Sequence, residues 1–447
     1  MKAFKKARFI FRLTGAFWKA RRRIILVAFL GGIIIALVIP RLYLYLQTKR
    51  PLKIGLVGRY DLDNLPREVL NQIGEGLVRE KKDGSFQPAL AKSWEILKKG
   101  KQYRFHLAND LSWHDGTELS SEDISFNFSD VLLKKINPKT IEFELKEAFS
   151  PFLSALAQPI LKKGLIGTGE YQLESLKRNG QFVESLTLKP VRKSQKKFVY
   201  KFYPGEDLTR LAFKLGKIDV ARGLTNISEF EAWPNVKIEE NIRHDRIILL
   251  IFNNKDPVLT EKSIRQALNY SLKKDWTPRA LGPLNPNSWA YNPNLKTYAY
   301  DLQKAKELLK KGFGGQESVD LELSLTTFSS LFPVAEKIAK QWEELSIKTK
   351  IQVTDVVPSG FQVFLVTQDL PSDPDQYLLW HSIQPHNLSQ LNNPQIDKLL
   401  EDGRQILDLE KRKEIYFDFQ RFLVEESPVV FLHHPTEYIL LRDNSNV

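Results

Sequence analysis

The residues of this 447-residue chain that could take part in catalysis are few and scattered. Because it has no cysteine, the chain lacks disulfides, thiol nucleophiles, Cys-ligated zinc sites and iron–sulfur clusters. No nucleophile elbow, phosphate-binding loop, dinucleotide fingerprint or H-E-x-x-H zinc motif is present. Of the seven histidines only His433 and His434 are adjacent, and adjacent residues of a strand point to opposite faces. The sequence therefore predicts a protein that is not an enzyme, without a metal site or a cofactor.

Two carboxylates, Asp369 and Asp373, are the best placed for ligand binding. They follow the apolar run at 361–366, and α/β sheets bind ligands at loops that leave the C-terminal ends of strands. In a closed cleft such a carboxylate can pair with a cationic group. The alternative is turn capping within Pro-Ser-Asp-Pro-Asp, which we favour for Asp373, while both interpretations stay open for Asp369. The run Trp113–Gly116 looks like an active site, but its Asp-Gly pair predicts a turn.

The elements around these residues alternate between the strand period and the helix period. Strands are predicted by apolar runs or alternation at 54–57, 103–107, 124–128, 141–145, 347–353 and either 429–432 or 438–441. Helices are predicted by apolar spacing at 208–215, 302–309, 335–345, 396–400 and 415–423. Asp301 is the expected N-cap of the second of these helices. This mixture indicates α/β lobes, and no fixed-period repeat is present.

The net charge of +13 is concentrated at the N-terminus. Residues 1–50 hold twelve basic residues and no acidic one, which leaves 54 basic and 53 acidic residues over 51–447. The body of the chain is therefore almost neutral and has no overall basic field for nucleic acid. Nucleic acid is not an expected partner.

An apolar run, Ile24–Ile39, follows a basic leader at 1–23 and continues into Leu42–Leu46. Together, residues 24–46 are long enough for one transmembrane helix. More basic residues precede the run than follow it, so the positive-inside rule puts the N-terminus in the cytoplasm and the main domain outside, in the periplasm or at the cell surface. A cleaved signal peptide is the alternative, although no Ala-x-Ala-like site follows the run. Residues 4–18 form either a basic helix on the cytoplasmic leaflet or a basic tail.

The chain resembles the extracytoplasmic solute-binding proteins of oligopeptide, dipeptide and nickel ABC importers, known as solute-binding family 5. The similarity covers residues 52–441 and depends on the shared order and spacing of short blocks. The blocks are Glu75–Val78, Gln87–Glu95, Tyr103–Leu107, Leu111–Ile124, Gly167–Tyr171, Leu215–Val220, Ile264–Ser271, Tyr300–Leu309, Asp373–Asp375, Asn393–Leu400 and Asp408–Arg412.

The resemblance implies an α/β fold of the two-lobed periplasmic-binding type II class, cluster C-like, with an extra small N-terminal subdomain. On this chain one lobe would comprise 51–255 and 425–447, including a small subdomain over residues 80–160, and the other lobe would comprise 256–424. The lobes are expected to close around a ligand by a hinge motion. The segment between the expected strands at 124–128 and 141–145 is shorter than in the family, so the small subdomain is trimmed.

The resemblance also implies where a ligand binds. In the family, a peptide backbone meets the loop after the first strand and a strand–loop of the second lobe. The corresponding residues here are Gly58, Arg59, Tyr60, Leu365, Val366, Thr367, Gln368 and Asp369. Asp369 matches the Asp that holds a peptide's amino group, but one extra residue separates it from Asp373, and Val366 stands where the family commonly has Trp. The solute class is therefore open among dipeptide, oligopeptide, nickel complex and sugar.

The implied function is that of a membrane-anchored extracytoplasmic substrate-binding protein. It would act as a monomer that captures a peptide-like solute and delivers it to the permease subunits of an ABC transporter. One alternative is a ligand-binding sensor on the same fold that has no permease. The other is an extracytoplasmic hydrolase, which the missing nucleophile motif weakens.

Overall fold

The computed structural model describes residues 50–81, 83–192, 195–316 and 320–443, and before them only the positions 27, 32 and 36–38. The basic leader and the predicted anchor at 24–46 lie outside the described residues, apart from those positions. Among the described residues, no helix is long and apolar enough to cross a membrane.

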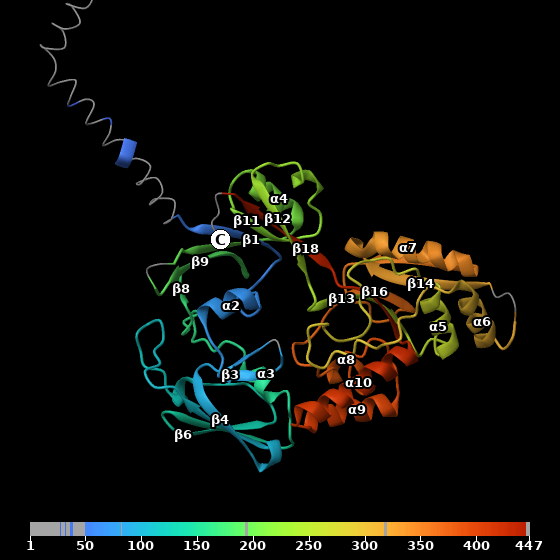
Figure 1. Cartoon of the computed structure of the whole chain (residues 1–447), viewed down its shortest axis with the longest axis horizontal. Coiled ribbons are helices and arrows are strands. Elements are labelled where there is room, and N and C mark those ends of the chain that lie inside the picture. The colour runs from blue at the N-terminus through green and yellow to red at the C-terminus, as the bar shows by residue number, and fades with distance from the viewer. Residues whose placement is uncertain are drawn as a thin grey trace, which may run out of the picture.

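The first lobe is built on a seven-stranded sheet in the order β12-β18-β11-β1-β10-β9-β8. The central strand β1 (Leu52–Val57) runs parallel to its neighbours β10 and β11, as expected for the apolar run at 54–57. The other strands are β8 (Tyr171–Asn179), β9 (Phe182–Pro190), β10 (Phe198–Tyr203), β11 (Val220–Leu224), β12 (Val236–Ile242) and β18 (Thr436–Arg442). Helix α2 (Arg67–Ile73) covers one face and α4 (Glu206–Lys214) packs over β1, β10 and β11 on the other (Figure 1).

The small subdomain contains a four-stranded antiparallel sheet in the order β4-β5-β7-β6. Phe105 and Phe143 pack edge to face in its core, and Phe143 also packs on Phe152. The predicted strand at 124–128 is wrong: the segment joins no ladder, although Phe126 and Phe128 still pack on this core. The elements are β2 (Val78–Glu80), β3 (Phe86–Pro88), β4 (Ala91–Leu97), β5 (Gln102–Leu107), β6 (Val131–Asn137), β7 (Thr140–Leu145) and α3 (Phe152–Leu156).

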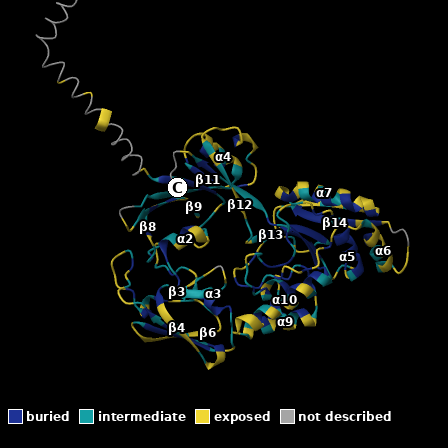
Figure 2. Cartoon of the chain, viewed as in Figure 1, coloured by how far each residue is buried: buried dark blue, intermediate teal, exposed yellow. Residues whose placement is uncertain are grey.

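The second lobe is built on a five-stranded sheet in the order β15-β14-β16-β13-β17. Both faces of its inner strands are buried (Figure 2), which explains their continuous apolar runs. The strands are β13 (Arg246–Phe252), β14 (Leu321–Phe328), β15 (Ile347–Thr354), β16 (Val363–Asp369) and β17 (Val429–His433). The helices are α5 (Lys262–Tyr270), α6 (Leu302–Gly312), α7 (Phe332–Trp342), α8 (Tyr377–Trp380), α9 (Pro394–Gln405) and α10 (Leu409–Glu426).

The chain passes between the two large sheets twice. Strand β13 falls inside the range predicted for the first lobe but pairs with β16 and β17, and β17 falls inside the predicted return segment 425–447. Strand pairing therefore places the crossovers between Ile242 and Arg246 and between His433 and Thr436. An apolar run such as that of β13 carries no local sign of which sheet it will join.

Candidate functional site

The two crossovers lie side by side and have the form of a hinge. The backbone N–H of Arg243 donates to the carbonyl of Pro435 (2.9 Å), and Nδ1 of His434 lies 2.7 Å from the carbonyl oxygen of Arg246. The rings of His244 and His434 meet edge to face at 5.1 Å. Two short paired connections between lobes let one rotate against the other while changing few backbone angles.

A cluster of charges surrounds this hinge, which we call the hinge cluster: Arg243, Asp245, Arg246, Asp369 and Glu437. Arg243 donates to both carboxylate oxygens of Glu437 (2.9 Å each) and to both of Asp245 (2.8 Å each). These contacts raise the pKa of Arg243, and the hydrogen bonds from Arg243 lower the pKa of Asp245. Arg246 donates to Glu437 at 3.4 Å, so the cluster joins β13 to β18 across the lobes.

Asp369 belongs to this cluster through Arg246, its cross-strand neighbour on β13. Nε of Arg246 donates to Oδ1 of Asp369 at 2.8 Å, and the Asp369 side chain is 80% exposed. The carboxylate is thus already paired and remains in contact with solvent. A ligand ammonium at this position would share Asp369 with Arg246 or displace it.

The backbone at the end of β16 is open on one side. The N–H of Leu370 donates to the carbonyl of Asp245 (2.8 Å), so in this antiparallel ladder Thr367 and Asp369 direct their N–H and C=O groups away from β13. On that other side β14 pairs with β16 only as far as Leu365. Among the described residues, the backbone groups of Thr367 and Asp369 have no strand partner there.

The loop after β1 approaches the hinge cluster from the first lobe. Gly58 has φ +138° and donates its N–H to the carbonyl of Tyr203 (2.7 Å), and a Cβ at this glycine would lie 2.5 Å from the Tyr60 hydroxyl oxygen. The Tyr60 hydroxyl donates to the carbonyl of Val57 (3.1 Å). Burial raises the pKa of Tyr60, and Arg246 opposes that shift, which places the phenol in the field of the hinge cluster. The guanidinium of Arg59 lies over the Phe182 ring.

The structure thus brings only some of the eight predicted ligand residues to one place. Tyr60 and Asp369 share the hinge cluster, and Thr367 contributes an open backbone and an exposed side chain. Leu365 and Val366 point their side chains into the core of the second lobe. Sequence reasoning missed Arg246, which lies 123 residues from Asp369 in the chain and gives no local signal.

A cavity of about 530 Å³ lies between the first and second lobes, beyond the end of β16. Its wall includes Ser372, three residues after Asp369, but none of the eight predicted residues. Burial raises the pKa of Glu80, and the Ser372 hydroxyl donates to this carboxylate across the lobes (3.1 Å). The lining residues are Arg67, Asn71, Gly74, Glu75, Gly76, Val78, Arg79, Glu80, Lys81, Gly84, Ala89, Ala157, Asn285, Asn287, Ser288, Trp289 and Ser372.

The small subdomain also contacts the second lobe directly, near the start of α3 and the end of α9 (Figure 1). The N–H of Ser150 donates to the carbonyl of Arg404 (2.7 Å) and its hydroxyl to that of Gly403 (3.1 Å). The loop that holds Gly84 lies directly against the Trp289 ring, because a Cβ at this glycine would overlap the ring. The described conformation is therefore a closed one.

Asp373 and the block Ile264–Ser271 have architectural roles. Asp373 forms a bidentate pair with Arg412 (2.5 and 2.9 Å), which is 4% exposed, and also accepts from the N–H of Asp375. This confirms turn capping and adds a buried ion pair.

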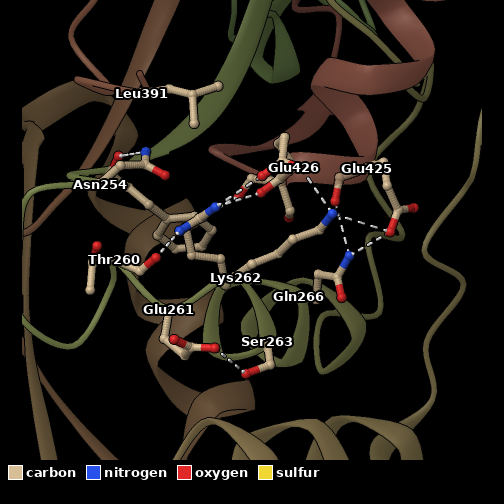
Figure 3. A network of polar contacts seen from close by, with 12 residues as sticks. Asn254, Thr260, Glu261, Lys262, Ser263, Gln266, Leu391, Glu425 and Glu426 are labelled. Carbon is tan, nitrogen blue, oxygen red and sulfur yellow. Dashed lines mark hydrogen bonds and ion pairs between the residues drawn. The ribbon is translucent and has the colours of Figure 1, made fainter. Parts of the chain in front are cut away.

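Within the block Ile264–Ser271, Arg265 donates to the backbone carbonyls of Leu259, Thr260, Glu426 and Ser427. Figure 3 shows the neighbouring contacts of Lys262 and Gln266 with Glu425 and Glu426. The block ties α5 to the end of α10.

Comparison with known proteins agrees with this architecture. The family model described as "Bacterial extracellular solute-binding proteins, family 5 Middle" matches residues 85–382. The chain is 23% identical over 458 residues to the dipeptide-binding protein of Escherichia coli K12, covering 79% of this chain and 82% of that protein. It is 28% identical over 292 residues to the nickel-binding periplasmic protein of the same strain, covering 54% of this chain and 56% of that protein.

Solved structures share the fold over most of the chain. NikZ from Campylobacter jejuni, in complex with Ni(L-His), has a TM-score of 0.74 and 26% identity, covering 88% of this chain and 94% of that one. AppA from Bacillus subtilis, in complex with a nonapeptide, has a TM-score of 0.71 and 20% identity, covering 89% and 95%. These relatives are binding proteins, and this chain is likewise not an enzyme. Because the family model matches more than half of its length, the chain belongs to the family 5 extracellular solute-binding proteins of bacterial ABC importers.

Proposed function

We propose that this protein captures a peptide-like solute between its lobes, while anchored to the membrane, and delivers it to an ABC permease. The observation that carries the proposal is the open backbone of Thr367 and Asp369 at the end of β16. An extended peptide can add to such an edge through main-chain hydrogen bonds, which give affinity without reading side chains.

The remaining predicted residues and the cavity fit around this edge. Tyr60 approaches the hinge cluster from the first lobe, directly after Gly58 and Arg59 in the chain, so a ligand at the edge would contact both lobes. The cavity of about 530 Å³ begins at Ser372 and offers space for the rest of the ligand. Ligand pockets commonly measure about 300–1,000 Å³. A ligand held by both lobes stabilises the closed form.

The hinge cluster also suggests how a peptide terminus would be held. Arg246 and Asp369 present opposite charges side by side, with Asp369 open to solvent. A free amino group fits Asp369, whereas a carboxylate fits Arg246. In a closed, drier cleft either contact is stronger than on an open surface.

Purified full-length protein tests the solute class directly. Small molecules that remain bound are identified by mass spectrometry, and calorimetric titration then compares dipeptides, oligopeptides, a nickel–histidine complex and a sugar. We expect a free-amino peptide to bind most tightly. Tight binding of the sugar alone would contradict the proposal, and binding without ATP-driven uptake by a reconstituted permease would favour the sensor alternative.

The membrane anchor is a separate part of the proposal, supported by the sequence of residues 24–46. We expect the full chain to remain with the membrane after washing with high salt and with carbonate, because a transmembrane helix is held by the bilayer core. Recovery of a mature chain that begins near residue 42 would contradict an uncleaved anchor.

A further inference from the structure

Among the described residues, no helix covers half of one face of the seven-stranded sheet. Helix α2 covers the face that carries Leu52, Ile54 and Leu56. On the opposite face α4 covers the centre of the sheet, while β8 and β9 run out beyond it (Figure 1). We call this uncovered half the open sheet face.

Lysines line the open sheet face. Lys201 on β10 lies beside Ser185 on β9, and Ser185 lies beside Lys177 on β8, so the three form a row across the sheet. Gly55 on β1 pairs with Lys201, and Lys53 lies two residues before it on the same face. On β9, Lys189 lies four residues after Ser185, also on this face.

The ammonium groups of these lysines repel one another, and no acidic partner is found for them in the part of the chain that the structure describes. Burial lowers the pKa of Lys201, and Lys53, Lys217 and Lys177 lower it further. Nζ of Lys201 donates to the carbonyl of Lys217 (3.2 Å). Among the described residues, no carboxylate lies within ion-pair distance of Lys53, Lys177, Lys189, Lys201 or Lys217.

Two carboxylates lie among these lysines without neutralising them. Asp219 is 3.8 Å from Arg50 and accepts from the backbone N–H of Lys53, and Glu184 partly offsets the pKa shift of Lys201. The sheet of the small subdomain is arranged differently, since Lys134 pairs there with Glu144 on the adjacent strand (2.6 Å). The open sheet face therefore keeps a surplus of positive charge.

An apolar stripe borders the same face. Leu208, Leu211 and Leu215, on α4 and at its C-cap, are 49%, 49% and 61% exposed and follow one flank of the helix. The other flank is occupied, because Arg210 and Lys214 both pair with Glu229 after β11. The leucines thus lie on the side of α4 toward β10 and the lysines.

The start of β1 places this face close to the membrane. Five residues lie between Leu46, the end of the predicted anchor, and Leu52, the first residue of β1, so the two are six residue steps apart. Six extended residues span about 20 Å at most. We propose that the open sheet face docks on anionic phospholipid headgroups, with the leucine stripe of α4 entering the interface. This inference depends on the proposed anchor.

The absence of cysteine makes the docking measurable in the full chain. A fluorophore on Ser185→Cys reports on the open sheet face, and one on Ser359→Cys reports on the second lobe. The chain is reconstituted in vesicles with a headgroup quencher, made of phosphatidylcholine alone or of equal parts phosphatidylcholine and phosphatidylglycerol. We expect strong quenching at position 185 only with phosphatidylglycerol. We also expect its loss in 1 M salt, where the Debye length is about 3 Å.

Charge reversal identifies the surface responsible. Lys53→Glu, Lys201→Glu and Lys217→Glu together should reduce the docked-to-undocked ratio more than about tenfold, since each basic residue near an anionic surface contributes to binding. The matched control is Lys340→Glu, Lys348→Glu and Lys350→Glu on the second lobe, which changes the net charge equally and should leave the quenching unchanged.

The outcomes separate this inference from the proposed function. Equal quenching in both lipids, or equal loss in both triple variants, would overturn the docking. If the variant at Lys53, Lys201 and Lys217 kept its quenching but lost solute uptake, the lipid proposal would be overturned in favour of a protein partner. Association with plain phosphatidylcholine vesicles reports the anchor alone, and calorimetry reports solute binding alone.

Discussion

At the scale of single residues, Asp369 tests the proposed contact with a ligand amine. Its pair with Arg246 is solvent-exposed, so Asp369→Asn should change the free energy of unfolding by less than about 1 kcal/mol. If Asp369 holds a peptide amino group in the closed cleft, the same change should cost roughly 2–5 kcal/mol of binding. Calorimetry with a free-amino peptide and its N-acetylated form measures this, and acetylation should matter little in the variant. Equal affinity of variant and wild type would refute the contact.

Asp373 should behave in the opposite way. It pairs with the buried Arg412, and removal of one partner leaves an uncompensated charge in the interior. Asp373→Asn is therefore expected to lower the free energy of unfolding by about 3–5 kcal/mol with little direct effect on solute contacts. Asp418→Asn, which breaks an exposed pair with Arg421, is the matched control and should cost less than about 1 kcal/mol. Chemical denaturation of both variants distinguishes the two cases.

His433, the last residue of β17, makes the free energy of unfolding depend on pH. Burial, together with the nearby charges of His434 and Arg279, lowers the pKa of its imidazole to about 4. The unfolded group titrates near 6.5, so the chain takes up a proton on unfolding between pH 6.5 and 4. Stability from the neutral ring is complete above pH 6.5 and is lost as the pH falls toward 4. His433→Gln should reduce the slope of stability against pH by up to the equivalent of about one proton, compared with the wild type. Denaturation across this pH range measures both slopes.

At the scale of elements, local patterns predicted much of the fold. Strands β1, β5 and β7 appear where apolar residues pointed to strands, and Asp301 caps α6 by accepting from the N–H of Lys304. Both alternatives for the last strand exist, as β17 and β18. The segment 124–128 has the strand pattern but no partner, because pairing depends on the rest of the sheet and not on the segment itself.

The candidate site was less predictable because its contacts join distant parts of the chain. Arg243 and Glu437 are 194 residues apart, and Arg246 and Asp369 are 123 apart. Neither pair has a spacing rule of the kind that links neighbours on a helix. The resemblance to a family predicted Tyr60 and Asp369 as site residues. Arg246, which lies between the two lobes, could be identified only from the fold.

At the scale of the whole molecule, Gly84 tests the closure. A side chain there would overlap Trp289 of the other lobe, so Gly84→Ala should hold the lobes apart and weaken solute binding. Gly116→Ala is the matched control, since that glycine has a similar positive φ and free space around it. Solution scattering should show an expanded particle for the first variant only. Two variants of the same size would contradict a closed contact at this position.

Ligand binding should make the molecule more compact and raise its stability. A solute that contacts both lobes favours the closed form, so scattering should show compaction of any open population. At a ligand concentration of 100 times Kd, the free energy of unfolding should rise by about 2.7 kcal/mol. A thermal unfolding series with increasing ligand measures this, and an unchanged scattering profile at saturation would count against lobe closure.

The position of β18 has a consequence for the order in which the protein is completed. This strand, at the end of the described chain, lies between β11 and β12 in the sheet that begins with β1. The whole second lobe is made between β12 and β18, and it is continuous in sequence from β13 to β17. During synthesis or secretion the second lobe can therefore assemble as a unit, as contiguous domains do. The edges of β11 and β12 that β18 will join remain unpaired in the first lobe until β18 has been made.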